Sequence, residues 1–299
     1  MTAMTEYDIA FLGNYTKDTI VSASGTRVVD GGAFNYGAQV AARMGLRVAA
    51  ITRLAREDWH VVEALAALGV DVFAEATPTS TCLRLEYPSS NPDERIIHVT
   101  SSAGSFTPAQ VREMQAQTFV IGPSFRGEVS LELIQTLATK GVRIAVDVQG
   151  WVRVVRDGNL AYEAWPEAHL FLAQVDILKT DAVEAKWLTG EADIRRAARL
   201  LADLGPGEIV LTHRDGLLVL ADRQFHEAGF FPNELVGRSG RGDTCLAAYV
   251  SKRLTASPGQ ATAWAAAVAS LKMEAEGPFR RDIGDVEELI RQKYDAPPD

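Results

Sequence analysis

Short apolar segments alternate with amphipathic segments along most of this 299-residue chain. Apolar runs that stop at a glycine or a polar residue predict buried strands. They cover 7–13, 46–52, 118–122, 143–148, 175–180 and 208–213. Between these runs, apolar residues recur every three or four positions, the spacing of a helix with one buried face. Such helices are expected at 34–44, 57–68, 130–141, 181–190 and 193–205. Strands that alternate with helices predict a doubly wound α/β fold with a mostly parallel sheet flanked by helices.

Two segments depart from that alternation. The residues from about 15 to 32 predict two short strands around Gly25, and those from about 73 to 103 predict a hairpin around the turn PSSNPD. We expect both segments to form a small antiparallel sheet that projects from the core. No linker rich in proline, serine or glycine divides the sequence, so residues 1–299 are expected to form a single domain.

Composition narrows the classes of function. The formal net charge is −9, which argues against general affinity for nucleic acid or anionic membranes. No stretch reaches the roughly 18 apolar residues of a membrane span, and the start of the sequence does not resemble a signal peptide. The two cysteines, Cys82 and Cys245, lie far apart and have no metal-ligand spacing. We therefore expect a cytoplasmic protein with reduced thiols.

A glycine-rich turn with an aspartate stands at the head of a predicted helix, in the sequence VGRSGRGDTCLAAYV at 236–250. Glycines let a backbone approach a ligand closely, and the free amides of a first helical turn bind anions. The carboxylate of Asp243 could accept a proton from a hydroxyl nucleophile. No lysine follows the last glycine, so this is not the nucleotide-binding P-loop. Two other interpretations stay open: an ordinary charged helix start, and the adhesion tripeptide Arg-Gly-Asp.

Two stretches together resemble a known family. SGRGDTCLAAY is similar to the second signature of the ribokinase-like, PfkB-type carbohydrate kinases, D-T-x-G-A-G-D-x-F. GGAFNYGAQVAARMG, at 31–45, resembles their first signature, G-G-x-x-x-N-x-A-x-x-x-x-x-L-G. Their order and separation also match, and the resemblance covers nearly the whole chain. It implies a ribokinase-like fold in which the projecting sheet is a lid over the acceptor site.

The resemblance assigns roles around the transferred phosphoryl group. It implies that Asp243 is the catalytic base and that Gly240, Arg241 and Gly242 form the anion hole. Arg241 stands where alanine is common, and either contacts a phosphate or substrate or points to solvent. Gly237 replaces an aspartate that helps many relatives to bind a monovalent cation, so the resemblance does not carry over potassium activation.

Four further residues would bind the acceptor. They are Asp18, Gly32, Asn35 and Asp147. Asp18 could instead cap a turn, and Asn35 could cap the helix that follows it. Asp147 ends a predicted strand, the place where ligands gather in α/β folds.

Donor and metal contacts follow in the same way. The family's N-x-x-E motif, which organises Mg²⁺, corresponds to Asp181 and Glu184; Glu184 could also lie on a solvated helix face. Lys179 would reach a phosphate. The nucleotide is implied to lie against Thr212, Gly216, Ala267 and Ser270. Ala267 and Ser270 could equally belong to the core. These two belong to a helix for which Ser257, Pro258 and Gln260 predict the start.

The implied reaction is transfer of the γ-phosphoryl group of ATP, with Mg²⁺, to a hydroxyl of a small sugar or cyclitol. The stretches DVQGWVR, LTHRDG and GRGDT are similar to the inositol-kinase-like branch, which favours an acceptor such as myo-inositol. A nucleoside is the next candidate acceptor. Pairing of two chains through the lid is a further expectation from the family.

Two other classes of protein compete with a kinase. A catalytically silent ligand-binding module could use the same fold, although the presence of Asp243 and Glu184 argues against it. A dinucleotide-dependent oxidoreductase would carry G-x-G-x-x-G after the first strand, and FLGNYTKD does not supply that pattern.

Overall fold

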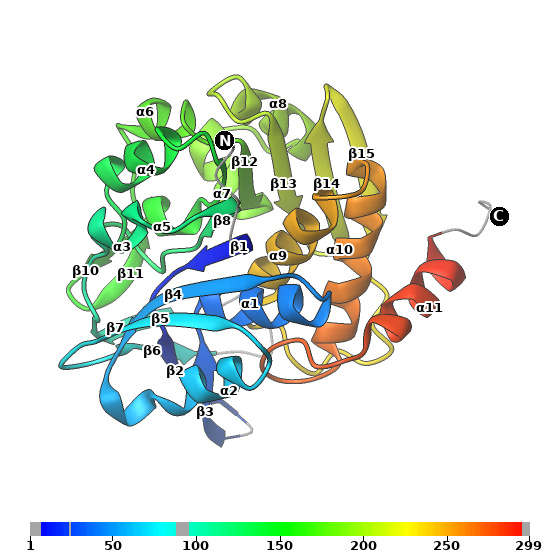
Figure 1. Cartoon of the computed structure of the whole chain (residues 1–299). Coiled ribbons are helices and arrows are strands. Elements are labelled where there is room, and N and C mark those ends of the chain that lie inside the picture. Colours follow the sequence, from blue (N-terminus) through cyan, green and yellow to red (C-terminus); the bar gives the residue numbers. More distant parts are fainter. Residues whose placement is uncertain (1–6, 24, 88–95, 295–299) are drawn as a thin grey trace, which may run out of the picture.

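A nine-stranded sheet forms the core of the computed structural model, which describes residues 7–23, 25–87 and 96–294 (Figure 1). The strand order is β15-β14-β13-β12-β9-β8-β1-β4-β5. The strands span β1 Tyr7–Leu12, β4 Val48–Leu54, β5 Asp71–Ala76, β8 Ala116–Ile121, β9 Arg143–Asp147, β12 Ile177–Asp181, β13 Glu208–Thr212, β14 Gly216–Ala221 and β15 Gln224–Gly229. Neighbours from β5 to β13 run parallel, and β14 and β15 add antiparallel pairs at one edge. The mostly parallel sheet and the six predicted strands are confirmed.

Helices cover both faces of this sheet. One face carries α1 Ala33–Arg43, α2 His60–Ala66, α9 Arg241–Arg253, α10 Pro258–Met273 and α11 Ile283–Lys293. The other carries α3 Ala109–Arg112, α4 Leu131–Ala138, α5 Gln149–Val152, α6 Ala168–Leu172, α7 Ala182–Thr189 and α8 Ile194–Ala202, and a short 3₁₀ helix, Arg56–Asp58, precedes α2. The doubly wound arrangement and the predicted helices are thus confirmed.

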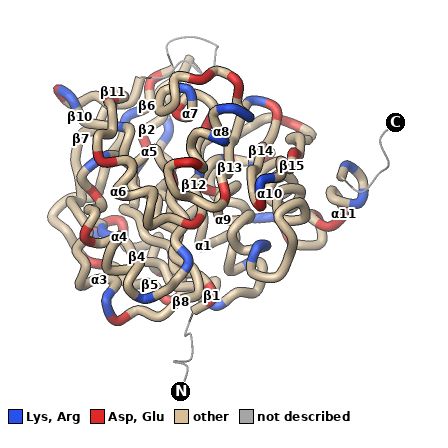
Figure 2. Tube along the Cα trace, turned by 90° about the horizontal axis from the view of Figure 1, so that it is seen from above, with Lys and Arg blue, Asp and Glu red and all other residues tan. Residues whose placement is uncertain are grey.

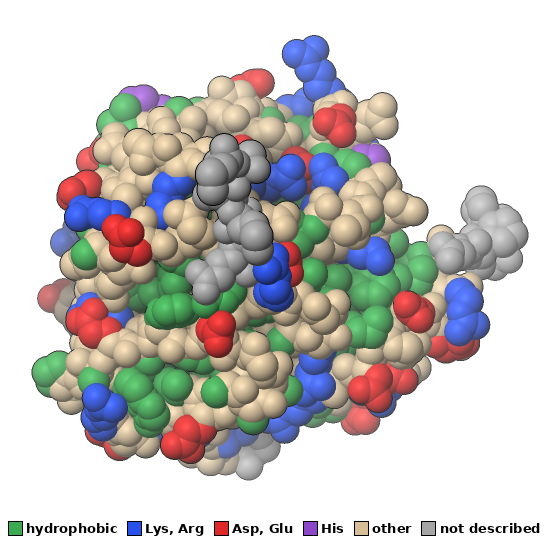
Figure 3. Space-filling view, in the orientation of Figure 1, with side chains coloured by type: hydrophobic (Ala, Val, Ile, Leu, Met, Phe, Trp, Pro, Cys, Tyr) green, Lys and Arg blue, Asp and Glu red, His purple; other side chains and the backbone are tan. Residues whose placement is uncertain are grey.

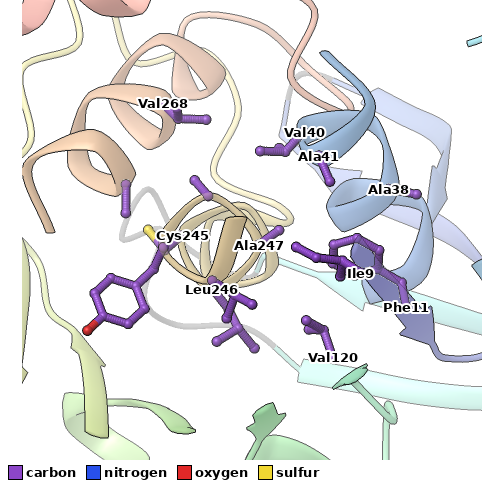
Figure 4. Close-up of a cluster of buried hydrophobic side chains, with 14 of the residues drawn as sticks. Ile9, Phe11, Ala38, Val40, Ala41, Val120, Cys245, Leu246, Ala247 and Val268 are labelled. Atoms are coloured by element: carbon purple, nitrogen blue, oxygen red, sulfur yellow. The ribbon is translucent and has the colours of Figure 1, made fainter. Parts of the chain in front are cut away.

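Alternation along each strand divides the core into two clusters. Ile9 and Phe11 of β1 face α1 and α9, whereas Ala10 and Leu12 face the opposite helices. Figure 4 shows the first cluster, in which Leu246 and Ala247 of α9 lie close to the β1 side chains. Because α9 is buried against the sheet, its N-terminus is held at a fixed place above the carboxyl ends of the central strands. That placement sets the position of the glycine-rich turn.

A second sheet of six strands has the order β10-β11-β7-β6-β2-β3. Its strands are β2 Thr16–Ser22, β3 Gly25–Gly31, β6 Thr81–Glu86, β7 Ile96–Ser101, β10 Arg153–Arg156 and β11 Asn159–Tyr162. The β2–β3 and β6–β7 pairs are antiparallel, as predicted. The predicted turn at 88–93 lies outside the described residues.

Three features of this sheet differ from the prediction. β2 and β6 pair in parallel, because β2 leaves the core sheet in the same direction as β6 and no tight turn joins them. Residues 73–76, expected in the projecting sheet, belong to β5 and pair with β4 in the core. The sheet also gains the hairpin β10–β11, whose turn places Asp157 and Gly158 at φ 48° and 78°. An Asp-Gly pair with two left-handed residues is a common hairpin turn, so the sequence did carry that signal.

The surface mixes charges of both signs. Figure 2 shows acidic and basic segments intermixed along the trace, and Figure 3 shows hydrophobic side chains among charged ones on one face. In the part of the chain that the structure describes, no helix is both long and apolar enough to cross a membrane.

Candidate active site

The glycine-rich turn forms the N-terminus of α9. Gly240 caps this helix in the left-handed region, at φ 74°, and a β-carbon there would overlap the ring of Tyr36. A β-carbon at Gly242 would lie 2.6 Å from Nζ of Lys179. Backbone conformation therefore favours glycine at the first position, and a side chain at the second position would have to displace the end of Lys179. The Arg241 amide donates to the Arg238 carbonyl, at 3.2 Å. The amides of Gly242 and Asp243 come next, in the first turn of the helix, where amides have no partner within the helix.

Asp243 is the third residue of α9 and is partly buried. A β-carbon at Gly122, just after β8, would lie 4.0 Å from its Oδ1. Burial raises the pKa of Asp243, the positive charges of Lys179 and Arg153 act against that rise, and the negative charge of Glu184 adds to it. The carboxyl group thus lies among strong charges in the first turn of a helix, an environment that suits a proton acceptor.

Two buried ion pairs lie beside this carboxylate. Lys179 of β12 and Asp147 of β9 are register partners, and their Nζ and Oδ2 atoms are 2.8 Å apart. Arg153 of β10 contacts Oε1 of Glu184 at 3.0 Å. Burial raises the pKa of Asp147, and Lys179 lowers it. The structure therefore brings Asp147, Lys179 and Glu184 together with Asp243, although they come from different parts of the chain.

Three of the four predicted acceptor residues, Asp18, Gly32 and Asn35, lie where the second sheet meets α1, whereas Asp147 ends β9 in the core sheet. Asp18 is in β2 and 8% exposed, so it belongs to a strand and does not cap a turn. Gly32 is the N-cap of α1, at φ 97°, and Asn35 lies inside that helix. Asn35 therefore does not cap the helix, contrary to the alternative interpretation. Its amide instead donates to the Asp30 carbonyl at 3.4 Å and its Oδ1 accepts from Gln39 at 2.9 Å.

Tyr36 connects the acceptor side to the base. Its ring packs on Gly240, and its hydroxyl group is buried with no hydrogen-bond partner in the described chain. Burial raises the pKa of Tyr36, and the negative charges of Asp18 and Asp243 raise it further. The phenol thus lies close enough to both carboxylates to be influenced by each.

A buried carboxylic acid lies next to the end of β1. Glu128 is 1% exposed and accepts from Asn14 Nδ2 at 2.8 Å and from the Ser124 amide at 2.6 Å. Burial raises the pKa of Glu128 to about 7, and these hydrogen bonds act in the opposite direction. The group contributes a pH-dependent term to stability near neutrality.

On the donor side, the predicted strand-turn-strand exists between β13 and β14. The Thr212 hydroxyl lies 3.5 Å from the Thr180 carbonyl, and the His213 amide donates to Gly216 at 2.9 Å. Gly216 is buried against the Ala228 carbonyl of β15. Burial lowers the pKa of His213. These residues lie at the end of β13, two strands from Asp147.

Ala267 and Ser270 lie in α10, and both side chains are fully buried. The Ser270 hydroxyl donates to the Ala266 carbonyl at 2.7 Å and accepts from the Phe231 amide at 2.9 Å. The ring of Phe231 in turn lies 5.4 Å from that of Tyr294. The helix packs against α9, β14 and β15, which is the core role that the sequence left open.

The residues expected at a metal ion offer few open oxygens. Glu184 Oε1 contacts Arg153, and its Oε2 accepts from the Asp181 amide at 2.9 Å. Asp181 Oδ1 accepts from the Glu184 amide at 2.8 Å, which completes a capping box for α7. Among the described residues no group of three or more His, Cys, Asp or Glu could hold a metal ion. Since Mg²⁺ keeps several waters and binds substrate phosphates, this pair fits a water-mediated role.

Three residues at this site were not singled out in the sequence. Arg153 ends the stretch DVQGWVR, and Tyr36 lies within the first signature. Lys272, 1% exposed, lies in α10 under the turn before Gly240. A lysine inside the apolar run AAAVASLKM was the one available signal, because buried lysines are rare unless they are paired.

Comparison with known proteins agrees with this geometry. The sequence pattern described as pfkB family carbohydrate kinase matches residues 4–280. The chain belongs to this family. It is therefore a phosphotransferase that uses an alcohol group as acceptor. A curated relative, the cytidine kinase of Thermococcus kodakarensis, is 25% identical over 256 residues, which cover 82% of this chain and 87% of that protein.

Solved structures of ribokinase-family kinases are similar over nearly the whole chain. A sulfate complex of a pyrophosphate-dependent kinase in the ribokinase family has a TM-score of 0.87 and 34% identity, covering 93% of this chain and 99% of that one. A pyrophosphate-dependent kinase complexed with a pyrophosphate analogue and myo-inositol has a TM-score of 0.86 and 33% identity, covering 94% and 99%. Arabidopsis thaliana ribokinase, complexed with ribose and ATP, has a TM-score of 0.76 and 19% identity, covers 95% and 99%, and supports the fold.

Proposed function

We propose that this kinase transfers a terminal phosphoryl group to a hydroxyl of a small cyclitol such as myo-inositol, with Asp243 as the base. The observation that carries the proposal is the N-terminus of α9. There a carboxylate, two helix-opening amides and the buried Lys179 lie together at the carboxyl ends of the central strands. Phosphoryl transfer needs these parts, a proton acceptor and fixed donors aimed at developing negative charge.

The reaction moves one proton and one phosphoryl group. The acceptor hydroxyl gives its proton to Asp243, and its oxygen forms a bond to the terminal phosphorus of the donor. The bond between that phosphorus and the bridging oxygen breaks, and the leaving group keeps the electron pair. The amides of Gly242 and Asp243 and the charge of Lys179 stabilise the phosphoryl oxygens. Mg²⁺, held through water near Asp181 and Glu184, would neutralise further charge on the donor.

For the acceptor, a cyclitol is favoured over a nucleoside. A solved relative at 33% identity binds myo-inositol, whereas the cytidine kinase is 25% identical. Asp18 and the unpartnered hydroxyl group of Tyr36 offer an acceptor and a donor of hydrogen bonds to a ring of hydroxyl groups. Asn35, beside them in α1, is assigned to the same acceptor.

For the donor, we propose pyrophosphate in place of the predicted ATP. Ala267 and Ser270, the residues expected against the adenine base, are both fully buried, and the Ser270 hydroxyl group is hydrogen-bonded within the protein. Cationic groups, in contrast, gather at the phosphate end: Lys179, Arg153 and Arg241. Two relatives above 30% identity are pyrophosphate-dependent. Pyrophosphate needs charge recognition but no base slot, which matches this distribution of residues.

One panel tests acceptor and donor together. The protein is incubated with Mg²⁺ and either pyrophosphate or ATP, and with myo-inositol, hexoses, pentoses or cytidine, and phosphorylated products are followed by phosphorus NMR. We expect turnover with pyrophosphate and myo-inositol. Turnover restricted to ATP would refute the donor proposal, turnover restricted to cytidine would refute the acceptor proposal, and no turnover with any pair would favour the silent binding module.

Asp243→Asn tests the role of the base. Asp285 provides a matched control, because it is also the third residue of a helix, α11, and also follows a glycine. Removal of a positioned general base costs about 10²–10⁴-fold in rate. We expect Asp243→Asn to lose kcat in that range while retaining acceptor affinity, and Asp285→Asn to keep the rate of the unmodified enzyme. Equal rates for the two variants would contradict the assignment.

A dimer formed through the second sheet completes the proposal. In the described residues β3 pairs only with β2, so its other edge is open, and Val28 on it is 58% exposed. Light scattering coupled to size exclusion should give twice the mass of one chain for the unmodified protein. The Val28→Lys variant should give the mass of a single chain. A monomeric unmodified protein would refute this.

A further inference from the structure

A buried lysine supports the turn that precedes the anion-binding amides. Lys272 of α10 is 1% exposed, and its Nζ donates to the carbonyl oxygens of Gly237, at 3.1 Å, and Ser239, at 2.5 Å. The amides of Val236 and Gly237 donate to the Met273 carbonyl at 2.9 and 3.0 Å. Residues 236–239 are thus fixed to the end of α10 by both backbone and side chain.

The turn leads directly into the site. Gly240 follows Ser239 and packs on Tyr36, and the Arg241 amide closes back onto Arg238 at 3.2 Å. Two carbonyl oxygens that point toward the same buried place repel each other unless a cation lies between them. If the ammonium group were lost, these carbonyls would turn away and the following peptide planes would rotate with them. The amides of Gly242 and Asp243 would then no longer keep their direction.

Several charged groups face this ammonium group. Burial lowers the pKa of Lys272 to about 8. The negative charges of Glu276 and Asp243 favour its protonated form, and the positive charge of Arg241 opposes it. The ring of Tyr36 lies 5.6 Å from Nζ and adds a weak attraction. The balance leaves Lys272 charged at neutral pH and close to titration in mildly alkaline solution.

We propose that Lys272 is a positioning residue whose ammonium group acts as a tethered cation for the turn 237–240 and so aims the α9 amides at the transferred phosphoryl group. This inference rests on the proposed phosphoryl transfer at α9. It assigns control over the rate of the chemical step to a side chain whose hydrogen bonds go to the backbone of the turn.

The test compares Lys272→Met with Lys252→Met. Lys252 is a partly buried lysine in α9 that lies 4.1 Å from the ring of Trp264, far along the helix from the turn. Loss of an oxyanion-type donor costs about 10²–10³-fold in kcat. We expect Lys272→Met to lose about 10²-fold in kcat and to bind methylenediphosphonate more weakly. Lys252→Met should keep the kcat of the unmodified protein.

Chemical rescue separates a charge effect from a packing effect. In Lys272→Ala, ammonium or methylammonium ions should restore part of kcat in a saturable manner, because they can occupy the vacated place. A Lys272→Met variant with unaltered kcat would overturn the proposal. So would a loss in Lys272→Ala that no small cation reverses.

The unmodified enzyme gives a second test that does not depend on how a variant folds. Its kcat/KM, which reports the free enzyme, should decline with one proton lost near pH 8, and Lys272→Arg should lack that decline because arginine keeps its charge. A kcat/KM that stays constant up to about pH 10, or a decline retained in Lys272→Arg, would overturn the proposal. If the unmodified protein phosphorylates no acceptor, the proposed function fails instead, so the two failures are distinguishable.

Discussion

Gly242→Ala and Gly284→Ala form a matched pair that tests how the anion-binding turn is packed. Each glycine is the second residue of a helix, α9 or α11. A β-carbon at Gly284 meets nothing within 4 Å, whereas one at Gly242 lies 2.6 Å from Nζ and 2.9 Å from Cε of Lys179. The two substitutions therefore share the change in backbone freedom and differ in what the methyl group meets.

The magnitude follows from two opposing terms. Alanine is favoured over glycine inside a helix by up to about 1 kcal/mol, and this term applies to both variants. At Gly242 the methyl group must displace Lys179, whose ammonium group is 2.8 Å from the buried Asp147. Overpacking costs about 1–3 kcal/mol, and a buried pair that is forced apart adds to it. We expect Gly284→Ala to be neutral or slightly stabilising and Gly242→Ala to lose about 1–3 kcal/mol.

The assays are urea unfolding and steady-state kinetics on both variants. Because Lys179 is assigned to the phosphoryl oxygens, Gly242→Ala should also lose about 10²-fold in kcat, and Gly284→Ala should not. The reasoning is refuted if both variants unfold at the same urea concentration and turn over at the same rate. In that case Lys179 would move aside at no cost, and the close packing under α9 would have no functional meaning.

Three further predictions concern charge. Burial raises the pKa of Glu128 from 4.5 to about 7, so the folded chain holds a proton that the unfolded chain releases. Its contribution to stability is complete below pH 4.5 and declines by up to about 3 kcal/mol as the pH rises through 7; unfolding measured against pH should show this decline, and Glu128→Gln should lack it. Arg153→Met should lower the free energy of unfolding by about 3–5 kcal/mol, measured with denaturant, because it leaves the buried Glu184 unpaired. Adding Glu184→Gln should recover much of that loss. An Arg153→Met variant as stable as the unmodified chain would contradict the assigned pairing. Removal of Mg²⁺ with EDTA should abolish turnover while the thermal midpoint shifts little, since the metal is held through the donor phosphates; a large fall in the midpoint would indicate a structural metal site instead.

Most of the core sheet could be predicted because its signals are local. A short apolar run predicts a buried parallel strand, and apolar residues that recur every three or four positions predict a surface helix. Each pattern can be recognised within a few neighbouring residues. The start of α10 was predicted in detail, since Ser257 and Gln260 form the capping box that their spacing indicates. The hairpin β10–β11 carries an equally local signal, because its turn residues Asp157 and Gly158 form an Asp-Gly pair with positive φ.

The organisation of the second sheet could not be obtained in this way. The parallel pairing of β2 with β6 joins residues 65 positions apart, such as Thr16 and Thr81. Nothing in either strand specifies the direction of its partner. The same limit applies to Ala267 and Ser270, because whether small residues line a slot or fill a core depends on which elements pack against the helix.

The sequence by itself determined which residues form the strands, which helices cover them, and where a glycine-rich turn meets a carboxylate at a helix start. These features depend on backbone conformation, side-chain periodicity and capping, which act over a few residues. Only the tertiary structure decided which charges meet. The pairs Lys179–Asp147 and Arg153–Glu184 and the contacts of Lys272 with the turn before Gly240 each join segments about thirty residues apart. Coulomb energy and desolvation depend on distance and burial in space, so no local pattern in the chain encodes them.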